Sequence, residues 1–177
     1  ALVMAAGAGE RLGSRTPKQY LPLAGGPGAL RRAIQSLTAH PRIDQVQVIV
    51  SPEAHDLYLE ATNGLQLNAP VPGGASRQNS VRAGLEALAG TEQPDFVLIH
   101  DAARPVIPTI VIDRVLDALE ISEAATPAIS VADTLAHTSD GKIEAPISRD
   151  GLVQVQTPQG FRFKEILAAH RAHADAV

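Results

Sequence analysis

Short runs of apolar residues alternate along this chain with segments whose apolar residues recur at helical spacing. The runs are Leu2 to Met4, Val46 to Val50 and Phe96 to Ile99, with Pro127 to Val131 predicted as a fourth. Strands that are apolar throughout are typical of a mainly parallel sheet covered by helices on both faces, so the predicted fold class is α/β. The expected buried faces of the helices are Leu30, Ala33, Ile34 and Leu37, then Val81, Gly84, Leu85 and Leu88, then Ile112, Val115, Leu116 and Leu119.

A glycine-rich segment, Ala5-Ala6-Gly7-Ala8-Gly9-Glu10-Arg11-Leu12-Gly13, directly follows the first apolar run. Small residues there let backbone amides approach phosphate oxygens, which indicates phosphate binding, and an ordinary turn between a strand and a helix is the alternative that this segment alone leaves open. A dinucleotide fingerprint is excluded, because the third glycine is one place late and no acidic residue follows at the required distance. A P-loop is excluded too, since Ser14-Arg15 replaces the Lys-Ser/Thr pair after Gly13.

Two cations lie in this segment or soon after it. Arg11 lies inside it, and Lys18 lies in the proline-stiffened turn Thr16-Pro17-Lys18-Gln19-Tyr20. When a phosphoryl group changes partners, negative charge develops on its oxygens, and fixed guanidinium and ammonium groups stabilise that charge. The alternative is that both are solvated surface charges.

A second chemistry-bearing segment, His100-Asp101-Ala102-Ala103-Arg104-Pro105, follows the strand that ends at Ile99. Ligands of open α/β sheets bind at the carboxyl ends of the strands, so Asp101 is a candidate magnesium ligand, with a turn cap as the alternative. His100 is interpreted as structural.

The segment from Gly73 to Val81 predicts a glycine turn that opens a helix, with Ser76 or Asn79 as the cap. Its amides and Ser80 could bind a base or a ribose, although a plain helix start explains the same residues.

Composition excludes several function classes. The 177 residues contain no cysteine, which removes disulfides, thiolate nucleophiles and thiolate zinc sites. A net charge of −4 without any long basic run argues against nucleic-acid binding. No apolar run approaches the roughly 18 residues of a membrane helix, so a cytoplasmic protein without membrane contact is expected. His170 and His173 are interpreted as surface residues, and no hydrolase triad is indicated.

Residues 1–177 are expected to form one domain with a projecting β-hairpin arm at approximately 133–150. Asp140-Gly141 is a plausible hairpin turn within this polar stretch. A hairpin that leaves a compact body buries little of its own surface, which favours a homodimer formed through the arm.

Five segments occur in a fixed order along the chain, and together they resemble the 2-C-methyl-D-erythritol 4-phosphate cytidylyltransferase family. They are Ala5 to Arg11, Pro17 to Tyr20, Gly73 to Val81, His100 to Pro105 and Thr157-Pro158-Gln159. The resemblance implies a Rossmann-like nucleotidyltransferase that transfers CMP from CTP to 2-C-methyl-D-erythritol 4-phosphate, with Mg²⁺ as cofactor, in non-mevalonate isoprenoid synthesis.

The resemblance also implies roles for individual residues. Arg11 and Lys18 would stabilise the reacting α-phosphorus, Asp101 would hold magnesium, and Arg149 would position the attacking acceptor phosphate. Arg104, Thr134 and Arg149 would act across a dimer interface, with help from Thr157 at the acceptor. The implied nucleotide-binding residues are Ala5, Ala6, Gly7, Gly9, Gly73, Gly74 and Ser80.

Two other functions remain open from the sequence. The sister enzyme that uses ribitol 5-phosphate shares the glycine segment, the lysine turn and the metal aspartate, and a catalytically inactive nucleotide-binding module is a candidate of another class. The resemblance further implies that the family domain continues beyond Val177 with another lysine, and that a second catalytic domain can be fused to it. Because Ala1 lies within an apolar run, the natural amino terminus is expected to precede it.

Overall fold

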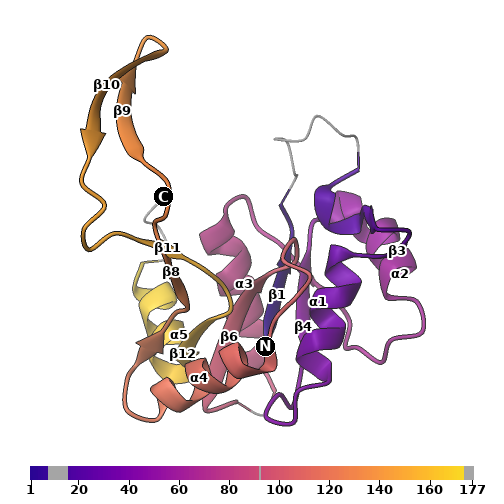
Figure 1. Cartoon of the computed structure of the whole chain (residues 1–177). Coiled ribbons are helices and arrows are strands. Elements are labelled where there is room, and N and C mark those ends of the chain that lie inside the picture. Colours follow the sequence, from indigo (N-terminus) through magenta and orange to yellow (C-terminus); the bar gives the residue numbers. More distant parts are fainter. Residues whose placement is uncertain (8–15, 92, 174–177) are drawn as a thin grey trace.

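The computed structural model describes residues 1–7, 16–91 and 93–173. Its main sheet has the strand order β5-β4-β1-β6-β12-β7, and helices lie on both faces (Figure 1). The sheet strands are β1 (Leu2–Ala5), β4 (Gln47–Val50), β5 (Val71–Pro72), β6 (Phe96–Asp101), β7 (Ala124–Ala125) and β12 (Gln159–Arg162). The helices are α1 (Ala29–Thr38), α2 (His55–Thr62), α3 (Arg77–Ala89), α4 (Thr109–Leu119) and α5 (Phe163–Ala172), with the 3-10 turns η2 (Lys18–Tyr20) and η3 (Pro52–Ala54).

Alternate residues of the central strands point to two separate apolar clusters. Val3 and Val48 pack with α1 and α4 on one face, while Leu2 and Ile49 pack with α3 and α5 on the other. The predicted apolar residues of α1, α3 and α4 are buried in these clusters, and α5 adds Phe163 and Leu167. The α/β prediction is confirmed, and it follows from strands that have no polar face.

The strands β5, β4, β1 and β6 run parallel, whereas β12 runs antiparallel to both β6 and β7. The strand predicted at Pro127 to Val131 lies outside this sheet. It is β8 (Ala128–Ser130), which pairs with β11 (Val153–Val155) in a separate two-stranded ladder whose residues are all exposed. An apolar run therefore predicted the strand correctly but not its burial.

Two further strand pairs complete the structure. A short pair, β2 (Pro22–Leu23) and β3 (Gly26–Gly28), leads into α1. The strands β9 (Leu135–Ser139) and β10 (Lys142–Ile147) form an antiparallel hairpin, which stands away from the body in Figure 1. Asp140 and Gly141 join them with φ of 49° and 75°, as a type I′ turn requires.

No helix of the described ranges is long and apolar enough to span a membrane.

A substitution at Gly160 tests the packing of β12 against α4. A Cβ there would lie 2.5 Å from Val115 Cγ1 and 2.9 Å from Leu119 Cδ1, both in a packed interior. We expect Gly160→Ala to lower the free energy of unfolding by about 1–3 kcal/mol, the usual cost of overpacking. Urea denaturation measures the change.

The matched control is Gly90→Ala, where a Cβ would meet only ordinary contacts at 3.5 Å or more and the backbone is already right-handed helical. This control should change stability by less than about 0.5 kcal/mol. Equal stability of the two variants would contradict the tight packing assigned to Gly160.

Candidate active site at the carboxyl edge of the sheet

Parallel pairing brings three of the predicted segments to one edge of the sheet. In register, Ala5 of β1 pairs with Val50 of β4, and Met4 pairs with Asp101 of β6. Beyond these pairs, Gly73 N donates to Val50 O at 2.9 Å, and the amide of Ala102 donates to Met4 O at 3.1 Å. The residues that follow β1, β5 and β6 therefore surround one place, as expected for a ligand site in an open α/β sheet.

The turn before α3 packs directly on the end of β1. A Cβ on Gly73 would lie 2.4 Å from the Cβ of Ala6, and one on Gly74 would lie 2.6 Å from the Cβ of Asn79. Only glycine permits the backbone to lie this close to the two Cβ atoms. The structure thus brings Ala5, Ala6 and Gly7 beside Gly73 and Gly74, all of them predicted nucleotide-binding residues.

Two serines hold this turn. Ser76 is the N-cap of α3, because its side chain accepts from Asn79 N at 3.1 Å, so one of the two predicted caps is confirmed. Ser80 is buried, and its hydroxyl accepts from Gly74 N at 3.0 Å and donates to Ser76 O at 2.9 Å. The Ser80 hydroxyl therefore fixes the shape of the turn whose amides were predicted to face a nucleotide.

The lysine turn lies against the same edge. Lys18 is exposed, whereas its neighbour Gln19 is buried and donates from Nε2 to Ala5 O at 2.9 Å and to Gly7 O at 3.0 Å. Sequence reasoning did not single out Gln19. Gly9 and Arg11, the other predicted residues of this region, lie outside the described residues.

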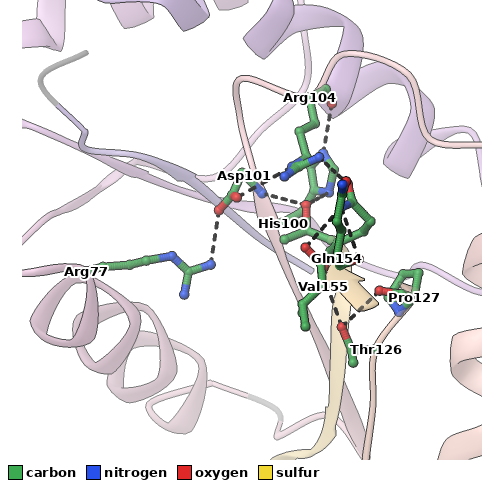
Figure 2. Close-up of polar contacts among 10 residues, drawn as sticks. Arg77, His100, Asp101, Arg104, Thr126, Pro127, Gln154 and Val155 are labelled. Atoms are coloured by element: carbon green, nitrogen blue, oxygen red, sulfur yellow. Dashed lines mark hydrogen bonds and ion pairs between the residues drawn. The ribbon is translucent and has the colours of Figure 1, made fainter. Parts of the chain in front are cut away.

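Two arginines flank the carboxylate of Asp101, as Figure 2 shows. Arg77 Nη2 lies 3.0 Å from Asp101 Oδ1, and Arg104 Nε lies 3.8 Å from Oδ2. Two guanidinium groups around one carboxylate leave this cluster with a net positive charge, which suits a polyphosphate ligand. Arg77 was not predicted as a site residue, although its position in the first turn of a helix opened by a glycine turn was visible in the sequence.

Hydrogen bonds of His100 and Thr157 hold the loop that follows β6. The His100 ring is fully buried, with Nε2 2.9 Å from Arg104 O and Nδ1 3.0 Å from Thr157 Oγ1. A carbonyl can only accept, so Nε2 carries the proton and Nδ1 accepts from the threonine hydroxyl. That hydroxyl oxygen also lies 3.4 Å from the donating amide of Asp101, which links the predicted residues Asp101, Arg104 and Thr157. Burial lowers the pKa of His100, which agrees with its structural interpretation.

The other two predicted acceptor residues lie at the base of the arm. Thr134 is exposed and directly precedes β9, and Arg149 is exposed and donates to the carbonyl of Ala132. The described contacts therefore place Arg149 with the arm and do not join it to Asp101 within one subunit.

A cavity of about 540 Å³ opens between α3 and α5, next to the Asp101 cluster. Arg77, Gln159 and Phe161 line it together with His170 and His173. His173 is exposed, whereas His170 is only partly exposed, with a buried Nδ1 and a pKa that burial lowers, so the surface interpretation holds fully for His173 alone. The reason is that α5 packs on α3, a contact that the spacing of two histidines does not reveal.

Comparison with known proteins gives the family of this chain. The model of the 2-C-methyl-D-erythritol 4-phosphate cytidylyltransferase family matches residues 1–177. The chain belongs to this family. The five segments singled out in the sequence thus resembled the right family, and each of them has described residues at the sheet edge.

Relatives with curated names agree with this family. The chain is 50% identical over 175 residues to the bifunctional enzyme IspD/IspF of Rhodospirillum rubrum, covering 98% of this chain and 45% of that protein. It is 51% identical over 172 residues to the bifunctional enzyme IspD/IspF of Rhizorhabdus wittichii, covering 97% of this chain and 44% of that protein. The chain therefore spans less than half the length of these relatives.

Solved structures share the fold. The 2-C-methyl-D-erythritol 4-phosphate cytidylyltransferase of Thermus thermophilus superposes with a TM-score of 0.79 at 30% identity, covering 99% of this chain and 76% of that one. A 4-diphosphocytidyl-2C-methyl-D-erythritol synthase gives a TM-score of 0.80 at 31% identity, covering 97% of this chain and 78% of that one. The fold is thus the Rossmann-like nucleotidyltransferase fold that the sequence predicted.

The lowered pKa of His100 predicts a pH dependence of stability. Below its ordinary pKa of about 6.5, the unfolded chain binds a proton at His100 that the folded protein, with its lowered pKa, binds less readily. The stability that His100 contributes is therefore present above pH 6.5 and is lost as the pH falls below it. We expect the wild type to lose stability more steeply than His100→Gln between pH 7 and pH 5, by up to about 1.4 kcal/mol per pH unit.

Urea denaturation at a series of pH values measures this difference. The glutamine introduced by His100→Gln would still offer an Nε2 donor to the Arg104 carbonyl, and the matched control is His137→Gln on the exposed arm, which should keep the wild-type slope. Parallel pH profiles of wild type and His100→Gln would contradict the neutral, buried imidazole.

Proposed function

We propose that the protein transfers CMP from CTP to 2-C-methyl-D-erythritol 4-phosphate, giving 4-diphosphocytidyl-2-C-methyl-D-erythritol and pyrophosphate in non-mevalonate isoprenoid synthesis. One observation carries the proposal. In a chain whose whole length matches this family, Ala5 to Gly7, the turn at Gly73 and Gly74, and the Asp101 cluster meet at one sheet edge. A phosphate oxygen of the acceptor forms the new bond to the α-phosphorus, and the bond from that phosphorus to the bridging oxygen breaks, releasing pyrophosphate.

The nucleotide site proposed here uses backbone more than side chains. Where the end of β1 packs on the turn before α3 at the sheet edge, Ala6 and Gly73 are both small, so a triphosphate could approach main-chain amides closely. Lys18, exposed beside this edge, and Arg11 would stabilise the charge that develops at the α-phosphorus. The proposed nucleotide-binding residues are Ala5, Ala6, Gly7, Gly9, Gly73, Gly74 and Ser80.

Asp101 is the residue proposed to hold magnesium. The described residues include no cluster of three or more groups able to ligate a metal, so a site built from protein side chains alone is not supported. One carboxylate with substrate phosphates is an ordinary magnesium site, and the half-exposed Asp101 fits that donor set. When bound, the ion would neutralise phosphate charge, while Arg77 would have to share the Asp101 carboxylate with it.

The acceptor site is proposed to need two subunits. Arg104, which the resemblance assigns to the dimer interface together with Thr134 and Arg149, is linked to Asp101 and Thr157 within its own subunit through His100 and the Asp101 carboxylate. Thr134 and Arg149 lie at the base of the arm. A homodimer formed through the arm would bring Thr134 and Arg149 of one subunit to the acceptor phosphate held by the other. We place the reaction in the cytoplasm, where CTP is available.

Pyrophosphate release tests the proposed function. The protein at its full natural length is incubated with CTP and magnesium, and with 2-C-methyl-D-erythritol 4-phosphate, ribitol 5-phosphate or no acceptor. We expect release only with the methylerythritol phosphate. Release only with ribitol 5-phosphate would keep the chemistry and replace the acceptor, while CTP binding without release would indicate a nucleotide-binding module.

Lys18→Ala tests the transition-state role of the lysine. We expect turnover to fall by roughly 100-fold or more with a smaller change in CTP affinity, because the ammonium group is proposed to act mainly on charge that develops during the reaction. Steady-state pyrophosphate release and calorimetric CTP binding measure the two quantities.

The matched control is Lys164→Ala, which removes an exposed lysine from the first turn of α5. Its turnover should equal that of the wild type. Unchanged turnover in Lys18→Ala would remove Lys18 from the mechanism.

A further inference from the structure

Gln19 is a buried polar side chain that the proposed function leaves without a role. Only 4% of the residue is exposed, and its Nε2 donates to Ala5 O at 2.9 Å and to Gly7 O at 3.0 Å. Burying an amide is unfavourable unless it forms hydrogen bonds, and here both N–H groups have partners. The side chain therefore joins η2 to the end of β1 across 14 residues of sequence separation.

A neutral amide at the end of a two-carbon stem suits this geometry, because a cationic donor in its place would bury a charge. The two carbonyls belong to residues on either side of Ala6 and both face one nitrogen, so that nitrogen must donate twice. Glutamate at neutral pH offers only acceptors, methionine offers no donor, and asparagine is one carbon shorter.

The two hydrogen bonds fix the backbone of Ala5 to Gly7. Because a peptide group is planar and trans, the direction of the Ala5 carbonyl also sets the Ala6 N–H, which points away from Gln19. Ala6 in turn packs against Gly73, where even one added Cβ would clash at 2.4 Å. The segment is thus held between Gln19 and the turn before α3.

The same side chain fixes the turn that carries Lys18. Within η2, Tyr20 N donates to Pro17 O at 3.0 Å and Leu21 N donates to Lys18 O at 3.3 Å, so the turn is closed by its own backbone. Gln19 attaches this closed turn to β1, while the neighbouring Lys18 side chain is exposed.

We infer that Gln19 is a positioning residue that holds the Lys18 turn and the Ala5 to Gly7 backbone as one rigid unit, so that lysine and amides meet the same triphosphate. This inference rests on the proposed function, because it requires Lys18 to act on the nucleotide. Misplacement of a reacting group by about 1 Å can cost on the order of 100-fold in rate. Loss of the two hydrogen bonds would therefore lower the rate by letting the Lys18 side chain move from its position.

Gln19→Met and Gln19→Glu test the role of these hydrogen bonds. Both keep the length of the side chain, but the first removes the donors and the second places a carboxylate against two carbonyls. We expect Gln19→Met to lower kcat by roughly 10- to 100-fold with a smaller change in the KM for CTP, and Gln19→Glu to lower kcat further.

Gln47 supplies a matched control. It is equally buried, and its Nε2 donates to Ala69 O at 2.7 Å and Val48 O at 3.4 Å, but it lies at the start of β4, at the opposite edge of the sheet. Gln47→Met should destabilise the fold in a similar way and leave kcat of the folded protein unchanged.

A double-mutant cycle separates positioning from a purely structural role. If Gln19 acts through Lys18, the roughly 100-fold effect of Lys18→Ala should shrink to less than about 10-fold in the Gln19→Met background, while it stays full in Gln47→Met. Additive effects in the Gln19→Met background, or a wild-type kcat in that variant, would overturn the inference.

A shorter amide variant and the activity of the wild type separate failure of folding from failure of the inference. If Gln19→Met does not fold, Gln19→Asn keeps the amide donors on a shorter stem, and it should still lower kcat and weaken the effect of Lys18→Ala; additive effects there overturn the inference. A wild type that releases no pyrophosphate with any acceptor overturns the proposed function and this inference together, whereas an active wild type with an unaffected Gln19→Met overturns the inference alone.

Discussion

The parallel pairing of β1 with β4 and β6 is the constraint on which the candidate site depends. Its register sets Ala5 beside Val50 and Met4 beside Asp101, so the chain leaves three strands at one edge. The two apolar clusters hold this register, since a shift by one residue would turn Val3 and Leu2 to the wrong faces. Burial of ordinary apolar side chains thus determines where Asp101 and the glycine turns lie.

Hydrogen bonds from buried side chains then convert this edge into a defined surface. Ser80 closes the turn at Gly74, His100 holds the loop after β6, and Gln19 attaches the lysine turn. Each of the three side chains forms hydrogen bonds with backbone groups, and Ser80 is in addition a proposed nucleotide-binding residue. The charged groups proposed to act on phosphate, Lys18 and the arginines around Asp101, lie outside this buried layer and depend on it for their geometry.

The sequence predicted the elements that have a periodic apolar pattern, but not the contacts between residues far apart in the chain. The helical faces of α1, α3 and α4 and the strand before Asp101 were predictable, because burial leaves a periodic pattern. The sheet position of β12 was not, since Gln-Gly-Phe-Arg has no apolar run and packs through Gly160. The roles of Arg77 and Gln19 depend on contacts with Asp101 and Ala5, which lie 24 and 14 residues away in the sequence.

The arm and the neighbouring β8–β11 ladder expose apolar side chains, which supports the proposal that the acceptor site needs two subunits. Ile129 and Val153 on the β8–β11 ladder and Ile143 on β10 are more than half exposed, an unfavourable arrangement for a ladder of only two strands. In the proposed homodimer, a second copy of the chain would bury these residues and bring Arg149 to the acceptor of its partner. The same contact would therefore stabilise the arm and complete the acceptor site, which makes dimerisation part of the proposed chemistry rather than an addition to it.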